Sequence, residues 1–327
     1  MSDLDKTMVI DPESNSSETE CCLICKCELH PDPEDNSFLR CPVCNYRKKI
    51  EVALTPGNIV GNKYKLLSYL NSGGCGDLFL CCPVENQSQR FVLKVLKNGG
   101  SVNLVRFQRE AMILSSIRNE RIEAVYDFWD SGDKSFIIME YISGSNLREI
   151  QNAYEIEEQT ALQIIQEVTL ALQFIWENYA IIHRDIKPEN IMMTEDYKIK
   201  LLDFGLSKQV NSSGIHDVTT ERVGIGTPGY MSPEQFLDSK HVDFKADIFS
   251  LGATLFYLIT GEKPITGKNH KDIYDCTRRN APPPASRLEG KCSPECIELI
   301  QFMMQLNPEN RPASYGVLLE RISALLT

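Results

Sequence analysis

The chain has 327 residues, of which 42% are hydrophobic and 24% are charged. These ordinary globular values exclude a collagen, a long coiled coil and a wholly disordered chain. No apolar run approaches the ~18 residues of a membrane-spanning helix, and the acidic N-terminus lacks the apolar segment of a secretory signal. The formal net charge of −11 argues against nucleic acid as the main partner, and we expect a cytoplasmic protein without a membrane span.

Residues 1–20 have the composition of a disordered acidic tail. They contain six acidic residues and one lysine, and they are rich in Ser and Asn without apolar periodicity. Thr7 lies in this segment and is a candidate phosphorylation site for a phosphothreonine-binding domain. An unmodified solubilising tail is the favoured interpretation.

Residues 21–50 are dense in cysteine. Two Cys-x-x-Cys pairs are separated by fifteen residues, a spacing typical of a structural zinc site that resembles a zinc ribbon. The ligands would be Cys22, Cys25, Cys41 and Cys44. Cys21 or Cys27 could replace a neighbour, and a flexible linker with reduced thiols is the alternative. Four thiolates leave no open position, so we expect a structural rather than a catalytic zinc, followed by a linker over residues 51–63 that contains Pro56 and Gly57.

The remaining chain alternates strand-like and helix-like segments. Short apolar runs bounded by Gly, Asn or Pro predict strands over Tyr64–Leu70, Asp77–Cys82, Arg90–Leu96 and Ser135–Tyr141. Helices are predicted over Val102–Ile117 and Asp247–Thr260, the latter stopped by Gly261. A further helix has an apolar face formed by Ala161, Ile164, Ile165, Val168, Ala171, Leu172 and Ile175. Strands first and helices later indicate an α+β protein, with a small β-rich lobe before a larger helical lobe.

Three features of the β-rich part are compatible with phosphate binding. Gly73, Gly74 and Gly76 lie between two predicted strands, where glycines let backbone N–H groups approach an anion. Lys94 lies within an apolar strand, and Glu110 lies in the next predicted helix. Each has an ordinary interpretation by itself: a glycine-rich hairpin, a solvent-facing lysine and a solvated helical glutamate.

Two polar segments follow apolar runs in the helical part. The first is His-Arg-Asp-Ile-Lys-Pro-Glu-Asn at residues 183–190, and the second is Asp-Phe-Gly at residues 203–205. With Gly-Thr-Pro-Gly-Tyr-Met-Ser-Pro-Glu at residues 226–234, they occur in the order and spacing of the protein kinase family. The chain from about Tyr64 onward therefore resembles the serine/threonine kinases of the bacterial, Hanks type, which implies a bilobal kinase domain over residues 64–327.

The resemblance implies roles for six catalytic residues, which are Lys94, Glu110, Asp185, Lys187, Asn190 and Asp203. Lys94 would hold the α- and β-phosphates of ATP, and Glu110 would hold Lys94. Asn190 and Asp203 would bind Mg²⁺ or Mn²⁺. Asp185 would accept the proton of the substrate hydroxyl, while Lys187 would neutralise the γ-phosphate.

The nucleotide site would be completed by residues from the glycine-rich loop, the neighbouring strands and the connection between the lobes. These are Leu70, Gly73, Gly74, Gly76, Leu78, Val92, Met139 as gatekeeper, Glu140 and Ile142 in the hinge, and Met192. The expected activity is transfer of the γ-phosphoryl group of ATP to Ser/Thr hydroxyls of protein substrates. In the active kinase the ribbon would serve recruitment of a partner or regulation. The alternative is a zinc-ribbon scaffold whose kinase-like domain binds nucleotide but transfers poorly.

The segment from Asp203 to Glu234 corresponds to the activation segment. Thr219 and Thr220 in its middle are candidate phosphorylation sites, because a phosphate there would pair with Arg184 and order the segment. The alternative is that both are solvated loop residues. Thr227 is expected to contact the catalytic Asp and Lys instead, and Glu234 is expected to pair with Arg311 in a structural role.

Overall fold

The computed structural model describes residues 27–28, 30–31, 33, 38–44, 47–49, 54–73, 76–97, 111–131, 134–204, 227–237 and 242–327. The expectations for the acidic tail, including Thr7, therefore lie outside the described residues. The same is true of Cys22, Cys25, Gly74, Glu110, Thr219 and Thr220. The chain falls into two compact units, Met1–Asn71 with Leu78–Phe91, and Ser72–Asp77 with Val92–Thr327. Each unit is described by itself.

A small antiparallel sheet lies in the cysteine-dense segment. Its strands are β1 (His30–Pro31), β2 (Phe38–Arg40) and β3 (Arg47–Lys49), in the order β1-β2-β3. His30 lies opposite Arg40, and Phe38 lies opposite Lys49. A turn at residues 42–44 lies between β2 and β3, with Cys41 just before it and Cys44 as its last residue.

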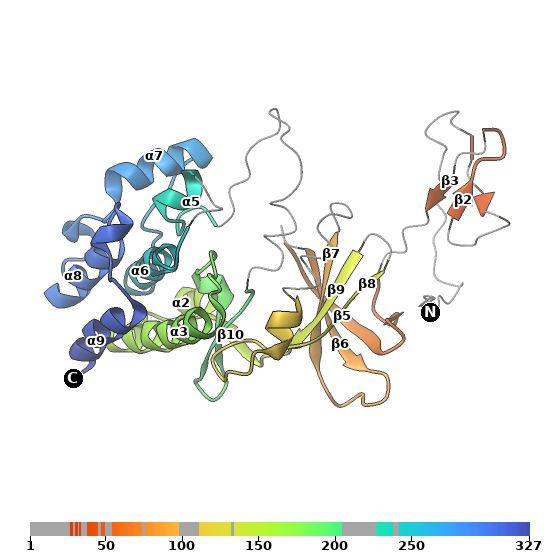
Figure 1. Cartoon of the computed structure of the whole chain (residues 1–327), viewed down its shortest axis with the longest axis horizontal. Helices are drawn as coiled ribbons and strands as arrows, with labels where there is room; N and C mark the ends of the chain where they lie inside the picture. The colour runs from red at the N-terminus through yellow and green to blue at the C-terminus, as the bar shows by residue number, and fades with distance from the viewer. Residues whose placement is uncertain are drawn as a thin grey trace. The chain divides into compact units, whose positions relative to one another are not determined.

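A six-stranded sheet has the order β4-β5-β6-β7-β9-β8 (Figure 1). Its strands are β4 (Ile59–Val60), β5 (Tyr64–Gly73), β6 (Gly76–Pro83), β7 (Phe91–Lys97), β8 (Val125–Ser131) and β9 (Lys134–Glu140). The four strands predicted from apolar runs are confirmed as β5, β6, β7 and β9. β4 lies within the segment expected to be a linker, and it pairs with the start of β5.

The helical part contains six α-helices of seven or more residues in the described chain. These are α2 (Leu147–Ala153), α3 (Glu158–Tyr179), α6 (Lys245–Thr260), α7 (His270–Asn280), α8 (Pro294–Met303) and α9 (Tyr315–Leu326). Shorter elements are α5 (Pro233–Leu237), η2 (Pro188–Asn190), η3 (Ala285–Arg287) and η4 (Pro308–Asn310). Side-chain caps begin several helices; Ser293 and Ser314, for example, accept backbone N–H groups at the starts of α8 and α9.

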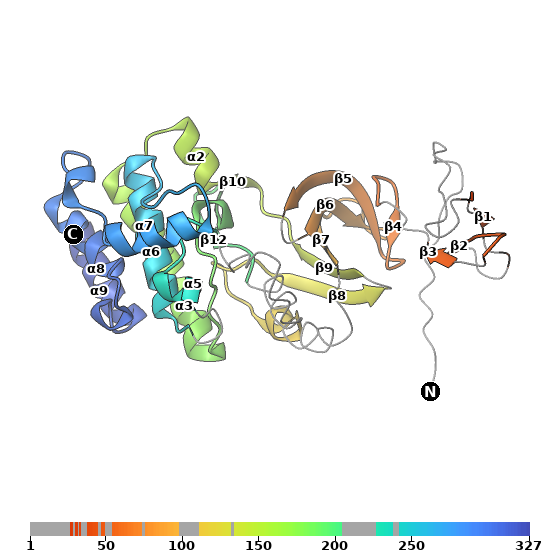
Figure 2. The same cartoon turned by 90° about the horizontal axis from the view of Figure 1, so that it is seen from above.

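The predicted apolar face of α3 is confirmed, since all seven residues predicted to form that face are buried. α3, α6, α8 and α9 pack on one another and are grouped together in Figure 2. α6 is buried from Lys245 to Ile259 and ends at Gly261, whose φ of 71° suits glycine. Gly252 lets α6 approach α8 closely, because a Cβ there would lie 2.8 Å from Met303. None of the described helices is long and apolar enough to cross a membrane.

A third sheet supports the polar segment at residues 183–190. It consists of β10 (Gly144–Asn146), β11 (Ile191–Thr194) and β12 (Ile199–Leu201), in that order. η2 leads directly into β11, and β12 ends two residues before Asp203. The β11–β12 hairpin therefore carries Asn190 at one end and Asp203 at the other, so pairing of the two strands brings both residues to the same edge.

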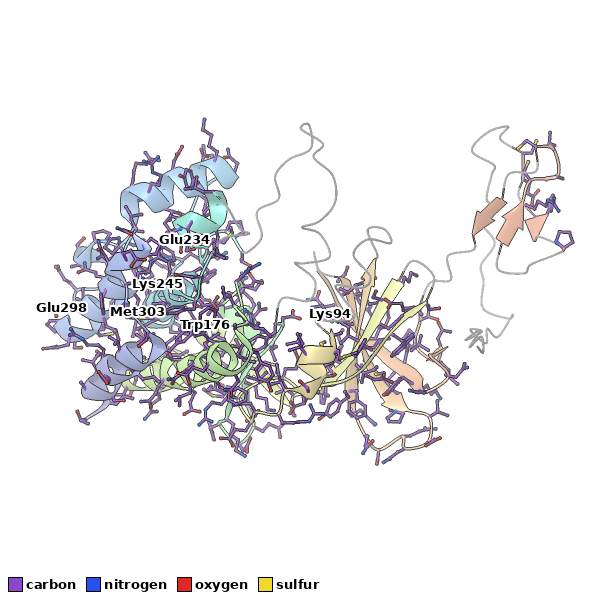
Figure 3. All side chains as sticks on the ribbon, viewed as in Figure 1. Lys94, Trp176, Glu234, Lys245, Glu298 and Met303 are labelled. Atoms are coloured by element: carbon purple, nitrogen blue, oxygen red, sulfur yellow. The ribbon has the colours of Figure 1, made fainter. Side chains whose placement is uncertain are left out.

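The ion pair expected between Glu234 and Arg311 is confirmed. The two nitrogens of the Arg311 guanidinium contact the two carboxylate oxygens of Glu234 at 2.6 and 2.9 Å. Arg311 also donates to the carbonyl of Lys245 at 2.9 Å, and Figure 3 labels Glu234 and Lys245 near one another in the helical part. The pair fastens α5 to the start of α6.

Candidate functional site

The segment at residues 183–185 is held by the helical core. The backbone N–H groups of His183 and Arg184 donate to the two carboxylate oxygens of Asp247 at 2.8 and 2.7 Å. Gln235 of α5 donates to the carbonyl of Arg184 at 2.9 Å. These bonds stabilise an unusual backbone conformation, since Arg184 has a φ of 66°, in the left-handed region that disfavours non-glycine residues. α5 and α6 thus determine where the next residue, Asp185, lies.

The His183 ring joins the two polar segments. The N–H of Asp185 donates to Nδ1 at 3.3 Å, so Nε2 carries the proton and donates to the carbonyl of Leu202 at 2.7 Å. The ring also packs edge-on against Phe204, with the ring centres 4.7 Å apart. The buried histidine therefore keeps residues 183–185 and residues 202–204 in fixed proximity.

The carboxylate of Asp185 is contacted on both oxygens. Thr227 donates to Oδ1 from its backbone N–H at 3.0 Å and from its hydroxyl at 3.1 Å. Lys187 Nζ lies 3.3 Å from Oδ2 and 2.6 Å from the Thr227 hydroxyl. Asn190 donates to Oδ2 at 3.1 Å and to the Asp185 carbonyl at 2.8 Å. The expected contact of Thr227 with Asp185 and Lys187 is confirmed, and an oriented carboxylate of this kind suits a general base.

Lys94 on β7, labelled in Figure 3, is buried, with 4% of its surface exposed. Its ammonium forms an ion pair with Asp203. Burial by itself would raise the pKa of Asp203, but the charge and hydrogen bond of Lys94 outweigh it and lower the pKa below its ordinary value. Asp203 is therefore ionised at neutral pH. The sequence resemblance implies that Glu110 pairs with Lys94, and that pairing stays a prediction.

Glu123 is a further acidic residue beside Asp203. Its Oε2 accepts the backbone N–H of Asp203 at 3.3 Å. Burial and the negative charge of Asp203 raise the pKa of Glu123 to about 8. Sequence reasoning missed this residue, as it missed the role of Asp247. The sequence did contain a signal for each. Glu123 lies between the apolar residues Ile122 and Val125, and Asp247 lies at the start of an otherwise apolar helix.

Asn190 and Asp203 fit a divalent cation. Asn190 is buried and uses its amide Nδ2 on Asp185, which leaves the carbonyl Oδ1 as its metal-binding atom. Asp203 contacts Lys94 through Oδ1 and presents a second oxygen. Carboxylate and amide oxygens are the hard donors that Mg²⁺ and Mn²⁺ prefer.

The predicted gatekeeper and hinge lie at the end of β9. Met139 is 5% exposed. The carboxylate of Glu140 contacts Lys200 Nζ at 2.7 Å through both oxygens and accepts the N–H of Ala124 at 3.2 Å. The Glu140 side chain is therefore occupied by protein contacts, and only its backbone is suited to an adenine ring.

Gly76 at the start of β6 occupies a position that only glycine fits. Its φ is 126°, and a Cβ there would lie 2.1 Å from the carbonyl oxygen of Val95. Gly76 therefore lies directly against β7, next to the residue that follows Lys94. Of the other loop residues, Gly73 ends β5.

The remaining positions of the predicted nucleotide site lie on separate elements. Leu70 is exposed on β5 and Leu78 is half-buried on β6, both in the first unit. Val92 on β7, Ile142 after β9 and Met192 on β11 belong to the second unit. Their contact with an adenine ring stays a prediction.

The cysteine-dense segment gives partial information on the predicted zinc ligands. Cys41 directly follows β2 and is buried, while Cys44 ends the next turn and is exposed. Cys27, upstream of β1, is half-buried. Within the part of the chain that the structure describes, no group of three or more His, Cys, Asp or Glu side chains is arranged to hold a metal ion. Cys22 and Cys25 lie outside that part.

Comparisons with known proteins agree on one family. Residues 64–321 match the family model described as "Protein kinase domain". The chain is 33% identical over 266 residues to serine/threonine-protein kinase PknB of Mycobacterium tuberculosis, covering 79% of this chain and 42% of that protein. It is 32% identical over 263 residues to serine/threonine-protein kinase cds1 of Schizosaccharomyces pombe, covering 76% of this chain and 55% of that protein. The chain thus spans about half or less of the length of these curated relatives.

A solved structure shares the fold. The crystal structure of Rad53 1–466 in complex with AMP-PNP matches with a TM-score of 0.67 and 21% identity, covering 81% of this chain and 66% of that one. This likeness confirms the expected α+β architecture of strands followed by helices.

Proposed function

The chain belongs to the protein kinase family, and on this premise we propose that the protein is a serine/threonine kinase that transfers the γ-phosphoryl group of ATP to protein hydroxyls. The observation that carries the proposal is the set of contacts to Asp185. Thr227 occupies Oδ1, while Lys187 and Asn190 contact Oδ2. The carboxylate is thereby oriented before a substrate arrives.

The residues divide the reaction between them. Asp185 would accept the proton of the substrate hydroxyl, and Lys187, close to the same carboxylate, would neutralise the γ-phosphate. Lys94 would hold the α- and β-phosphates once its ammonium moves from Asp203 to the nucleotide. Asn190 and Asp203 would hold Mg²⁺, which supplies charge neutralisation on the phosphates when bound.

The test is transfer of label from ATP in the presence of Mg²⁺ to the protein itself and to a generic basic protein. We expect the unaltered chain to transfer label, and Asp185→Asn to lose transfer while keeping its melting temperature. Asp203→Ala should lose transfer as well. Equal labelling by the unaltered chain and Asp185→Asn would contradict the assignment. Nucleotide binding without transfer would favour the scaffold alternative.

We propose that phosphorylation of Thr219 or Thr220 regulates the site through Arg184. Nε of Arg184 is buried, and within the described residues it has no hydrogen-bond partner. Buried guanidinium N–H groups are normally satisfied, so a phosphate on the activation segment is a suitable acceptor. The backbone of Arg184 is fixed by Asp247 and Gln235, so a phosphate held there would transmit its position to Asp185.

We also propose that residues 21–50 form a zinc-ribbon-like unit with Cys22, Cys25, Cys41 and Cys44 as ligands. The three-stranded sheet and the position of Cys41 and Cys44 around its β2–β3 turn support this proposal. A segment of this size has too little apolar surface to fold without a staple. The unit would recruit a protein partner. The proposed need for ATP fits a cytoplasmic kinase domain that acts on protein substrates.

A further inference from the structure

Glu123 reaches the catalytic centre through a strand contact between distant parts of the chain. Ile122 forms a parallel bridge with Leu201, the last residue of β12. The Leu201 N–H donates to the carbonyl of Arg121 at 2.8 Å, and the Glu123 N–H donates to the carbonyl of Leu201 at 3.0 Å. This pairing puts Glu123 beside the residues that follow Leu201. Its carboxylate consequently accepts the N–H of Asp203 at 3.3 Å.

The surroundings of the Glu123 side chain are mostly apolar. A cavity of about 20 Å³ is lined by three ionisable residues and six apolar ones. The ionisable residues are Lys94, Glu123 and Asp203, and the apolar ones are Leu114, Ile117, Ile122, Val125, Met139 and Phe204. A carboxyl group among such side chains is costly unless it makes a hydrogen bond, and packing alone would favour an apolar residue here. Of the two neighbouring glutamates, Glu140 has its carboxylate bound to Lys200. Glu123 is the glutamate that contacts Asp203.

Asp203 has an uncommon backbone conformation. Its φ is 58°, in the left-handed region, which aspartate adopts more readily than most non-glycine residues but still uncommonly. With that conformation, its N–H is directed to Glu123 while its carboxylate contacts Lys94. A rotation of the Asp203 backbone that removed the carboxylate from Lys94 would also break the bond to Glu123.

We propose that Glu123 is a positioning residue that fixes the main chain of Asp203, so that the Asp203 carboxylate stays at the phosphate and metal site. The inference rests on the proposed role of Asp203 as a Mg²⁺ ligand. Glu123 contacts neither nucleotide nor metal itself; it acts through the Asp203 amide.

The test measures Mn²⁺ binding to the full chain with the ATP analogue AMP-PNP, by the spectroscopic signal of free Mn²⁺. Glu123→Leu removes the acceptor and should weaken Mn²⁺ binding about tenfold, which corresponds to about 1.4 kcal/mol. Glu123→Gln keeps a carbonyl acceptor and should stay within about twofold of the unaltered chain. Glu120→Gln is the matched control, because Glu120 lies on the same segment with 72% of its side chain exposed. It should change nothing.

A purely structural role would not give this pattern. Metal-free AMP-PNP binding should be the same in Glu123→Leu as in the unaltered chain, so that only the metal-dependent part changes. Unchanged Mn²⁺ affinity in Glu123→Leu overturns the proposal. Equal weakening in Glu123→Leu and Glu123→Gln also overturns it, because the second variant retains the acceptor.

A measurement on the unaltered chain covers the case in which Glu123→Leu does not fold. The amide of Asp203 should be protected from hydrogen exchange in the unaltered chain and in Glu123→Gln. Rapid exchange of this amide in the folded, unaltered chain overturns the proposal. Neither measurement requires phosphoryl transfer, so failure of the proposed function is distinguishable from failure of this inference.

Discussion

Removal of the Arg311 side chain should destabilise the helical part severely. The guanidinium is fully buried, and its five N–H groups meet five acceptors. Two are the carboxylate oxygens of Glu234, and three are the backbone carbonyls of Lys245, Gln305 and Leu306. The cation also lies 5.0 Å from the ring centre of Phe249.

Arg311→Ala leaves Glu234 without its cation and three carbonyls without their donor. Breaking one side of a buried ion pair costs about 3–5 kcal/mol. Since a domain of this kind unfolds with about 5–15 kcal/mol, the loss is a large fraction of the total. Arg311→Lys should lose less, because it keeps the charge, but three ammonium donors cannot reach all five acceptors.

The assay is urea unfolding at neutral pH, with Arg148→Ala as the matched control. Arg148 contacts Glu189 at 2.6 Å, the same chemistry and distance, but about half of its side chain is exposed. Its removal should cost less than about 1 kcal/mol. A loss below 1 kcal/mol for Arg311→Ala, or equal losses in the two variants, would refute the reasoning from burial.

Three further outcomes are expected. Thr219→Ala combined with Thr220→Ala should lower activity toward an external substrate, and Arg184→Ala should cause a similar loss. The triple variant should lose little more activity than the double variant, because the three residues serve one interaction. Full activity of the double variant would exclude regulation by phosphorylation at these two threonines. Metal analysis of gently prepared, reduced protein should find about one zinc per chain, lost in Cys41→Ser, and absence of zinc would exclude the ribbon. Burial raises the pKa of Cys81 to about 12, so at pH 8 about one thiol in ten thousand is ionised, and iodoacetamide should label it only after unfolding.

Local periodicity was sufficient to predict the helices and strands whose sequence has one clear hydrophobic pattern. The apolar face of α3 was predicted residue by residue, because burial against a core selects the helical period directly. β8 was not predicted. Its sequence mixes Asp127 and Asp130 with aromatic residues, since it is the edge strand of the sheet and much of it stays accessible to water.

Contacts over long sequence distances were not accessible to pattern reasoning. The order of the polar segments, through the family resemblance, predicted Asp185 and Asp203 as site residues. It did not indicate that Asp247 holds the backbone before Asp185, or that Glu123 holds the backbone of Asp203. Both depend on which segments lie beside one another, as in the bridge of Ile122 with Leu201.

The bonds from Asp247 to the N–H groups of His183 and Arg184 have a consequence for heat inactivation. The segment before Asp185 has no internal regular structure, and its shape is inherited from the first turn of α6. Melting of α6 would therefore displace Asp185, the proposed base, in the same step. Loss of activity on heating should coincide with loss of helical circular dichroism, without a temperature range in which the helices persist and the base is already displaced.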